Sequence, residues 1–155
     1  MRILLATMNP GKLREYERLL ADVPGLELET MASLAEPVNV VEDCDTFIGN
    51  ARKKATEVAA VAGVPCLSDD SGLEVDALGG RPGVHSARYS GESATDASNN
   101  AKLLEELSGV AAAARTARFL CAIVVVDAEG RELAVAEGAC EGRIGRELRG
   151  TQGFG

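Results

Sequence analysis

Short apolar runs alternate with segments of helical periodicity along this chain. Residues 2–6 form an apolar run that predicts a buried strand, and apolar residues recur at helical spacing from Leu13 to Leu20. A second helix is predicted over residues 47–62, with Asp45 as its N-cap and Gly63 as its end. The N-terminal segment is therefore predicted to fold as strand, tight loop and helix.

The second half of the chain adds further strand patterns and one helix. The helix is expected to begin after the N-cap Thr95 and to end at Gly109. Strands are expected at residues 64–67, 73–77, 116–127, 133–139 and 141–144, with a hairpin turn at Ala128-Glu129-Gly130.

Composition and charge restrict the possible partners. The 155 residues fit one domain, and 46% hydrophobic with 26% charged residues is typical of a folded protein. A net charge of −8 repels nucleic-acid backbones, and only 3% aromatic residues argue against a platform for stacking single-stranded bases. We therefore expect no nucleic-acid partner, whereas a small phosphorylated ligand needs only one basic cluster or a metal ion.

The cysteines and the N-terminus bear on location. The four cysteines lack the paired close spacing that marks zinc sites and redox dithiols, which favours reduced thiols in a cytoplasmic protein. No N-terminal apolar region is long enough for a signal peptide or a membrane span. We therefore expect no membrane partner.

Two adjacent carboxylates, Asp69 and Asp70, follow the apolar run at residues 64–67. Like charges held close together must be offset by a cation, a proton or hydrogen-bond donors. Neighbouring side chains on a strand point in opposite directions, so both carboxylates can reach one ligand only if the strand breaks at Ser71-Gly72. We predict a divalent metal and a phosphate here; a solvated turn is the alternative.

The loop Thr7-Met8-Asn9-Pro10-Gly11-Lys12 joins the first strand to the first helix. Free backbone N–H groups and the positive end of the helix would face a phosphate there, and Lys12 would add a full charge. A Walker A loop is disfavoured, because Ala6 replaces its first glycine and Leu13 its hydroxyl residue. The alternative for this loop is an ordinary strand-to-helix turn. Glu42, which precedes the second helix, is another candidate site residue, and its alternative is an acidic residue favoured there by the helix dipole.

Several motifs occur together in a fixed order. They are Ala6-Thr7-Met8-Asn9-Pro10-Gly11-Lys12, Glu42 with Thr46-Phe47, Ser68-Asp69-Asp70-Ser71-Gly72-Leu73, the loop at residues 79–89, Thr116-Ala117-Arg118-Phe119 and the terminal Gly153-Phe154-Gly155. In this order and spacing they resemble the non-canonical purine nucleoside triphosphate pyrophosphatases, the inosine/xanthosine triphosphate pyrophosphatase family. The likeness spans essentially all 155 residues.

The resemblance implies an α/β fold with a mixed twisted sheet and flanking helices, in an elongated two-lobed single domain with a central cleft. It also implies a homodimer and a Mg²⁺-dependent cleavage of ITP, dITP or XTP to the monophosphate and pyrophosphate. The domain would span residues 1–155 and lack the family's C-terminal part, because the Tyr-Asp-Pro, Lys and Ser-His-Arg motifs that follow Gly-Phe-Gly in the family are absent.

The resemblance also assigns roles by position. Asp70 would activate water with support from Asp69, while Lys12 would stabilise charge on the leaving pyrophosphate. Glu42 and Asp70 would hold Mg²⁺. The substrate contacts would come from Thr7, Met8, Asn9, Pro10, Gly11, Lys12, Lys54, Ser71, Phe154 and Gly155. The central expectation is that Lys12 and Asp70 converge on one triphosphate, with Glu42 close by.

The chain departs from the family's pattern at Met8, Cys44, Gly49 and His85. Gly49 lies within a predicted helix and is expected to weaken it by about 1 kcal/mol relative to alanine. Two other functions stay open: a nucleotide kinase or phosphatase that acts at the terminal phosphate, and a nucleotide-binding module without turnover.

Overall fold

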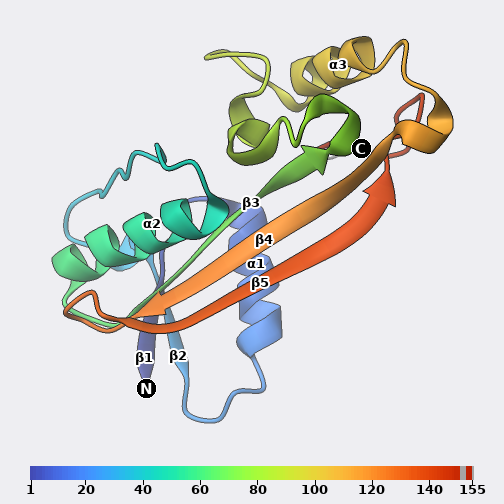
Figure 1. Cartoon of the computed structure of the whole chain (residues 1–155). Helices are drawn as coiled ribbons and strands as arrows, with labels where there is room; N and C mark the ends of the chain where they lie inside the picture. The colour runs from blue at the N-terminus through green and yellow to red at the C-terminus, as the bar shows by residue number, and fades with distance from the viewer. Residues whose placement is uncertain (151–152, 155) are drawn as a thin grey trace. The chain divides into compact units, whose positions relative to one another are not determined.

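A computed structural model describes residues 1–150 and 153–154 of the chain (Figure 1). Five strands form one sheet in the order β2-β1-β3-β4-β5. Their bounds are Arg2–Leu5 for β1, Glu27–Thr30 for β2, Cys66–Val75 for β3, Thr116–Val126 for β4 and Glu132–Arg143 for β5. β1 pairs in parallel with β2 and β3, whereas the short turn between β4 and β5 makes an antiparallel hairpin. The sheet is therefore mixed, as expected.

The described residues form three α-helices beside the sheet: α1 (Pro10–Leu20), α2 (Phe47–Ala62) and α3 (Asp96–Glu106). The chain divides into two compact units, and β3, β4 and β5 contribute residues to both. Unit 1 comprises Met1–Asp70 and Ala122–Glu137, and unit 2 comprises Ser71–Cys121 and Gly138–Gly155.

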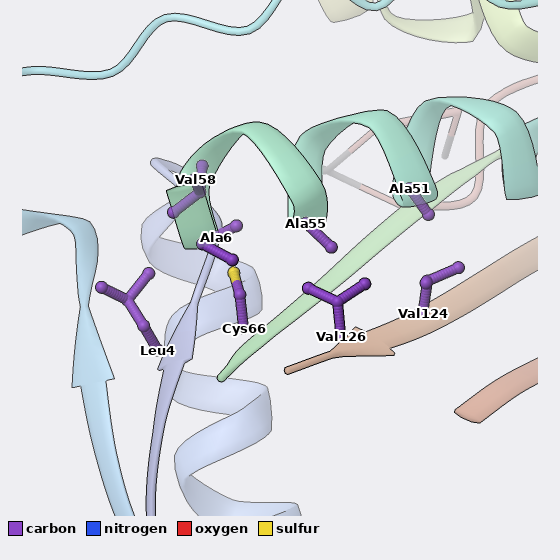
Figure 2. Packing of buried hydrophobic residues seen from close by; sticks show 9 residues of the cluster. Leu4, Ala6, Ala51, Ala55, Val58, Cys66, Val124 and Val126 are labelled. Carbon is purple, nitrogen blue, oxygen red and sulfur yellow. The ribbon is translucent and has the colours of Figure 1, made fainter. Parts of the chain in front are cut away.

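In unit 1 the side chains of β1 and β3 alternate between two apolar cores. Leu4 and Cys66 pack with Val58 of α2, in the cluster that Figure 2 shows between the helix and the strands. Leu5 belongs to a second cluster, with Tyr16 of α1. Successive strand residues point to opposite faces, so α1 and α2 cover opposite faces of this part of the sheet. Burial raises the pKa of the Cys66 thiol to about 12.

The ends of α2 are set by local hydrogen bonds. Thr46 is the N-cap, since its Oγ1 accepts the Gly49 N–H at 3.0 Å, and the expected cap at Asp45 is wrong. Gly63 ends the helix in the left-handed conformation at φ 65°, where its N–H donates to the Ala59 carbonyl, as predicted.

β3 runs unbroken through Ser71-Gly72, so the predicted break of the strand after Asp70 is wrong. β1 pairs only with Cys66 and Leu67, but β4 is 11 residues long and lies on the other side of β3 in the sheet. β3 is therefore not limited to the two residues that pair with β1, and its pairing with β4 supports a longer strand. The separate strand expected at residues 141–144 is likewise the end of one long strand, β5.

Unit 2 has its own apolar core between β3, β4 and α3. The core consists of Leu73, Val75, Tyr89, Leu103, Leu107 and Ala117. Thr95 caps α3 as predicted, in a reciprocal pair of hydrogen bonds with Ser98. The Tyr89 hydroxyl donates to Glu106 at 2.8 Å, and burial together with this carboxylate raises the pKa of Tyr89 to about 12.

Two further observations concern the whole described chain. No helix within residues 1–150 and 153–154 has the length and apolar character required to cross a membrane. All four cysteines carry free thiols.

The structure gives a reason for Gly49. A Cβ atom at this position would lie 2.9 Å from the Cys44 Cβ and 2.9 Å from the Thr46 Oγ1. The segment before α2 folds back closely over the first turn of the helix, and only a residue without a side chain allows this approach. The cost of glycine in the helix is thus offset by the packing of the loop that follows Glu42.

We expect Gly49→Ala to lower the free energy of unfolding by about 1–3 kcal/mol, because the added methyl group overpacks this contact. Helix propensity alone predicts the opposite sign. Urea denaturation measures the difference. Gly109→Ala is the matched control, since Gly109 has open space around its Cβ position and no positive φ; it should be neutral or stabilising by up to about 1 kcal/mol. Equal effects of the two substitutions would contradict the packing explanation.

Candidate active site

Lys12 and Asp69 form an ion pair beside the end of β1. The Lys12 Nζ lies 2.6 Å from Asp69 Oδ2, and the Asp69 side chain is only 4% exposed. Asp69 is two residues after Leu67 on β3, so the two side chains point to the same face of the strand. Leu67 packs in the core against α1, and the Asp69 carboxylate therefore faces the first turn of that helix. The lysine supplies the charge that this buried carboxylate needs.

The N–H groups at the start of α1 are already bonded. Asn9 caps the helix, and its Oδ1 accepts the N–H of Gly11 at 2.8 Å and that of Lys12 at 3.3 Å. Pro10 has no N–H, and the Leu13 N–H bonds to the Asn9 carbonyl. The expectation of free N–H groups here is therefore wrong, because the cap uses them. Lys12 and the helix dipole remain as the attraction for a phosphate.

Asp70 points to the other face of β3. Its Oδ2 accepts a hydrogen bond of 2.9 Å from the Asn50 Nδ2 in α2, and Asn50 is completely buried. Cys66 is four residues earlier on β3, so its side chain points to the same face as Asp70. It packs in the core against α2, which agrees with this direction. The two aspartates thus do not share one ligand through a break in the strand. Each is met by a different helix.

Glu42 and Asp70 both contact α2. The Lys54 ammonium pairs with the Glu42 carboxylate, and Lys54 is one helical turn beyond Asn50, which binds Asp70. Residues four apart on a helix are neighbours, with Cβ atoms about 5–6 Å apart. One face of α2 therefore holds the two carboxylates that were predicted to bind metal. Lys54, expected to contact substrate, pairs with one of them.

The two carboxylates fit Mg²⁺. No group of three or more His, Cys, Asp or Glu side chains among the described residues could hold a metal ion. Mg²⁺ is usually bound by one or two carboxylates and completes its shell with water and substrate phosphates, so Glu42 and Asp70 suffice. On the other face of β3, Asp69 Oδ1 is buried without a hydrogen-bond partner in the described structure.

Lys12 and Asp70 both lie beyond the carboxyl end of β1. Leu5, the last residue of β1, pairs with Leu67, so the two aspartates lie just beyond the end of β1, beside the loop that begins at Thr7. Ligands of open sheets with parallel strands typically bind at the carboxyl ends of those strands. Lys12 contacts Asp69 on the α1 side of β3 and Asp70 faces α2, so the convergence of Lys12 and Asp70 on one triphosphate stays a prediction. Within the loop, Thr7 Oγ1 accepts the Asn9 N–H, and Met8 is exposed.

The remaining predicted substrate residues belong to unit 2. Ser71 and Phe154 line a pocket of about 180 Å³, and the Phe154 ring lies 6.4 Å from that of Phe119. Gly153 is tied to α3, because its N–H donates to Asp96 and its carbonyl accepts from Asn100. Gly155 lies outside the described residues.

The motifs did not identify Asn50 as a site residue. A signal was present, since Asn50 interrupts the apolar stripe of α2 three residues after Phe47 and directly before Ala51. A buried carboxamide requires hydrogen-bond partners, and its position predicts one on the sheet. The identity of that partner could not be predicted from spacing.

The fold and these motifs have relatives among known proteins. The profile of the Ham1 family matches residues 3–155. This chain belongs to the Ham1 family. A dITP/XTP pyrophosphatase of Desulforamulus reducens is 49% identical over 155 residues, which cover 100% of this chain and 76% of that protein. A dITP/XTP pyrophosphatase of Geobacillus kaustophilus is 49% identical over 153 residues, which cover 99% of this chain and 74% of that protein.

Solved Ham1 structures agree with the fold. A HAM1 protein from Coxiella burnetii superposes with a TM-score of 0.89 at 39% identity, covering 100% of this chain and 78% of that one. A nucleoside-triphosphatase / dITP/XTP pyrophosphatase from Mycobacterium abscessus superposes with a TM-score of 0.86 at 42% identity, covering 99% of this chain and 81% of that one. The family membership inferred from the ordered motifs is confirmed, as is the mixed sheet with flanking helices.

The Lys12–Asp69 pair gives a prediction about stability. Lys12→Met leaves a buried carboxylate without its cation, and we expect a loss of about 1–3 kcal/mol in the free energy of unfolding. Asp69→Asn should cost less, because Lys12 is 26% exposed and can reach water. The double variant should recover part of the Lys12→Met loss. Urea denaturation of the three variants measures this order.

The control is a pair of equal length at the surface. Lys53 Nζ lies 2.6 Å from Asp43 Oδ1, with the Asp43 side chain 62% exposed. Lys53→Met should not change the unfolding midpoint measurably, since exposed ion pairs contribute little. A Lys12→Met variant as stable as Lys53→Met would show that Asp69 does not depend on Lys12.

Proposed function

We propose that this chain hydrolyses non-canonical purine nucleoside triphosphates, ITP, dITP and XTP, to the monophosphate and pyrophosphate, and so removes them from the nucleotide pool. The observation that carries the proposal is the Lys12–Asp69 ion pair just beyond the carboxyl end of β1, with Asp70 as the next residue of β3. The names of the Ham1 relatives as dITP/XTP pyrophosphatases support the choice of substrate.

Each residue has a role that follows from its surroundings. Lys12, at the positive end of α1, attracts the phosphates and stabilises the charge that develops on the leaving pyrophosphate. Asp70, held by Asn50, accepts the proton of the attacking water. Asp69 fixes the position of the Lys12 ammonium through their ion pair.

Mg²⁺ is the proposed cofactor, with Glu42 and Asp70 as its protein ligands. When bound, it would neutralise charge on the triphosphate. Glu42 is oriented by Lys54, and this pairing keeps the carboxylate on the α2 side of β3, where Asp70 also points.

A triphosphate would bind the same Lys12 ammonium group that pairs with Asp69. The two contacts are compatible, because a lysine has three N–H donors: one can keep the contact with Asp69 while another reaches a phosphate oxygen. The capping carboxamide of Asn9 also lies where a phosphate oxygen would meet the Gly11 and Lys12 N–H groups. We propose that Thr7, Met8, Asn9, Pro10, Gly11 and Lys12 contact the phosphates. The substrate contacts of Ser71, Phe154 and Gly155 stay predictions of the family resemblance.

Homodimer formation remains a prediction of the family resemblance, and a cytoplasmic location remains a prediction of the cysteine pattern. Size-exclusion chromatography with light scattering measures the first of these.

Product analysis tests the function. The chain is incubated with ITP, XTP, dITP, ATP and GTP, with Mg²⁺ and with a chelator in its place, and the products are separated by ion-exchange chromatography. We expect inosine or xanthosine monophosphate with pyrophosphate, only when Mg²⁺ is present. Orthophosphate with a diphosphate would favour the kinase or phosphatase alternative, and tight binding of ITP without products would favour a binding module.

Asp70→Asn tests the base. Without a proton acceptor, turnover of ITP should fall by at least about a hundredfold. Asp43→Asn is the matched control, because Asp43 is an exposed acid before α2 that pairs with Lys53, and it should retain the parent rate. A rate for Asp70→Asn within tenfold of the parent would remove Asp70 from this role.

A further inference from the structure

Asn50 makes one hydrogen bond at each end of its side chain, inside the apolar face of α2. Its Oδ1 accepts the Cys44 backbone N–H at 2.9 Å, and its Nδ2 donates to Asp70 Oδ2 at 2.9 Å. The residue is completely buried, next to Ala51 of the core cluster. Both ends of this carboxamide are therefore held by protein groups from two other segments of the chain.

These two contacts determine how the amide is oriented. Because Oδ1 faces a backbone N–H, a reversed amide would place its NH₂ group against another donor and its oxygen against a carboxylate. Only one orientation satisfies both neighbours. The NH₂ group is thus directed at Asp70 and fixes the direction of that carboxylate relative to α2.

The same side chain also fixes the segment that carries Glu42. Cys44 is two residues beyond Glu42, and its backbone N–H donates the hydrogen bond that Asn50 Oδ1 accepts. Gly49 lets this segment pack against the helix, and Lys54 holds the Glu42 carboxylate one turn further on. Asn50 therefore connects the backbone beside one proposed metal ligand with the carboxylate of the other.

We propose that Asn50 is a positioning residue of the active site, which sets the Asp70 carboxylate and the Glu42 segment in the relative geometry that hydrolysis requires. The inference rests on the proposed function. Small displacements of a reacting group, on the order of 1 Å, can cost about a hundredfold in rate. Asn50 does not bind substrate in this scheme, so its loss lowers kcat and leaves KM nearly unchanged.

The kinetic test uses Asn50→Asp, which keeps the shape but replaces the donor with an acceptor. With ITP as substrate we expect kcat to fall at least about tenfold and KM to change less than about threefold. Asn50→Ser, which also lacks the NH₂ donor, is the second variant should the first fail to fold. Val58→Ala is the control for general damage to α2, because Val58 is fully buried on this helix in the apolar cluster, and it should keep the parent kcat.

The same substitution in an Asp70→Asn background separates positioning from a purely structural role. If Asn50 acts through Asp70, Asn50→Asp should lower the residual rate of Asp70→Asn by less than about twofold, since the group it positions is already lost. An equal fold-loss in both backgrounds would overturn the proposal. So would a rise in KM without a fall in kcat, or a Val58→Ala variant with the same loss of kcat.

A measurement without turnover keeps this inference distinct from the proposed function. The reversed pair Asn50→Asp/Asp70→Asn regains one donor facing one acceptor, so its urea midpoint should recover most of the loss caused by Asn50→Asp alone. Additive losses of the midpoint would overturn the coupling between Asn50 and Asp70. If the parent chain releases no pyrophosphate from any purine triphosphate, the proposed function fails, and this comparison still decides whether Asn50 and Asp70 act as a pair.

Discussion

Two consecutive buried carboxylates on β3 are the constraint on which unit 1 depends. Asp69 is 3% exposed and Asp70 is 8% exposed, and a charge at such depth is tolerated only when cations or donors surround it. The alternation of a strand sends the two side chains to opposite faces, which keeps the like charges apart. Each face must then supply its own partner, Lys12 from α1 and Asn50 from α2.

This constraint links the apolar cores to the polar site. α1 and α2 are held against the sheet by separate apolar clusters, and each helix also carries polar residues that contact carboxylates. Small residues on the buried face of α2, with Gly49 at its first turn, allow close approach of the helix to its surroundings. The packing therefore determines where Asn50 and Lys54 meet the carboxylates Asp70 and Glu42.

The arrangement suits phosphate chemistry, which depends more on positioning and charge neutralisation than on covalent help. The Lys12 ammonium lies with Asp69 on one face of β3 and Asp70 lies on the other, just beyond the carboxyl end of β1. Membership of the Ham1 family places this chain among proteins named as dITP/XTP pyrophosphatases. The polar contacts of Asn50 add a residue that the ordered motifs did not single out.

Local patterns were enough to predict much of this protein. The apolar stripes of the helices, the cap at Thr95, the end of α2 at Gly63 and the ordered motifs were all readable from the sequence, because each depends on residues a few positions apart. The continuity of β3 through Ser71-Gly72 was not, because it depends on the length of β4, a strand that follows much later in the chain. Only the tertiary structure decided that Lys12 meets Asp69 while Asn50 meets Asp70, and that Gly49 makes room for Cys44. The contacts of Lys12 and Asn50 join segments far apart in the sequence. They depend on which face of the sheet each helix covers, and no local pattern encodes that choice.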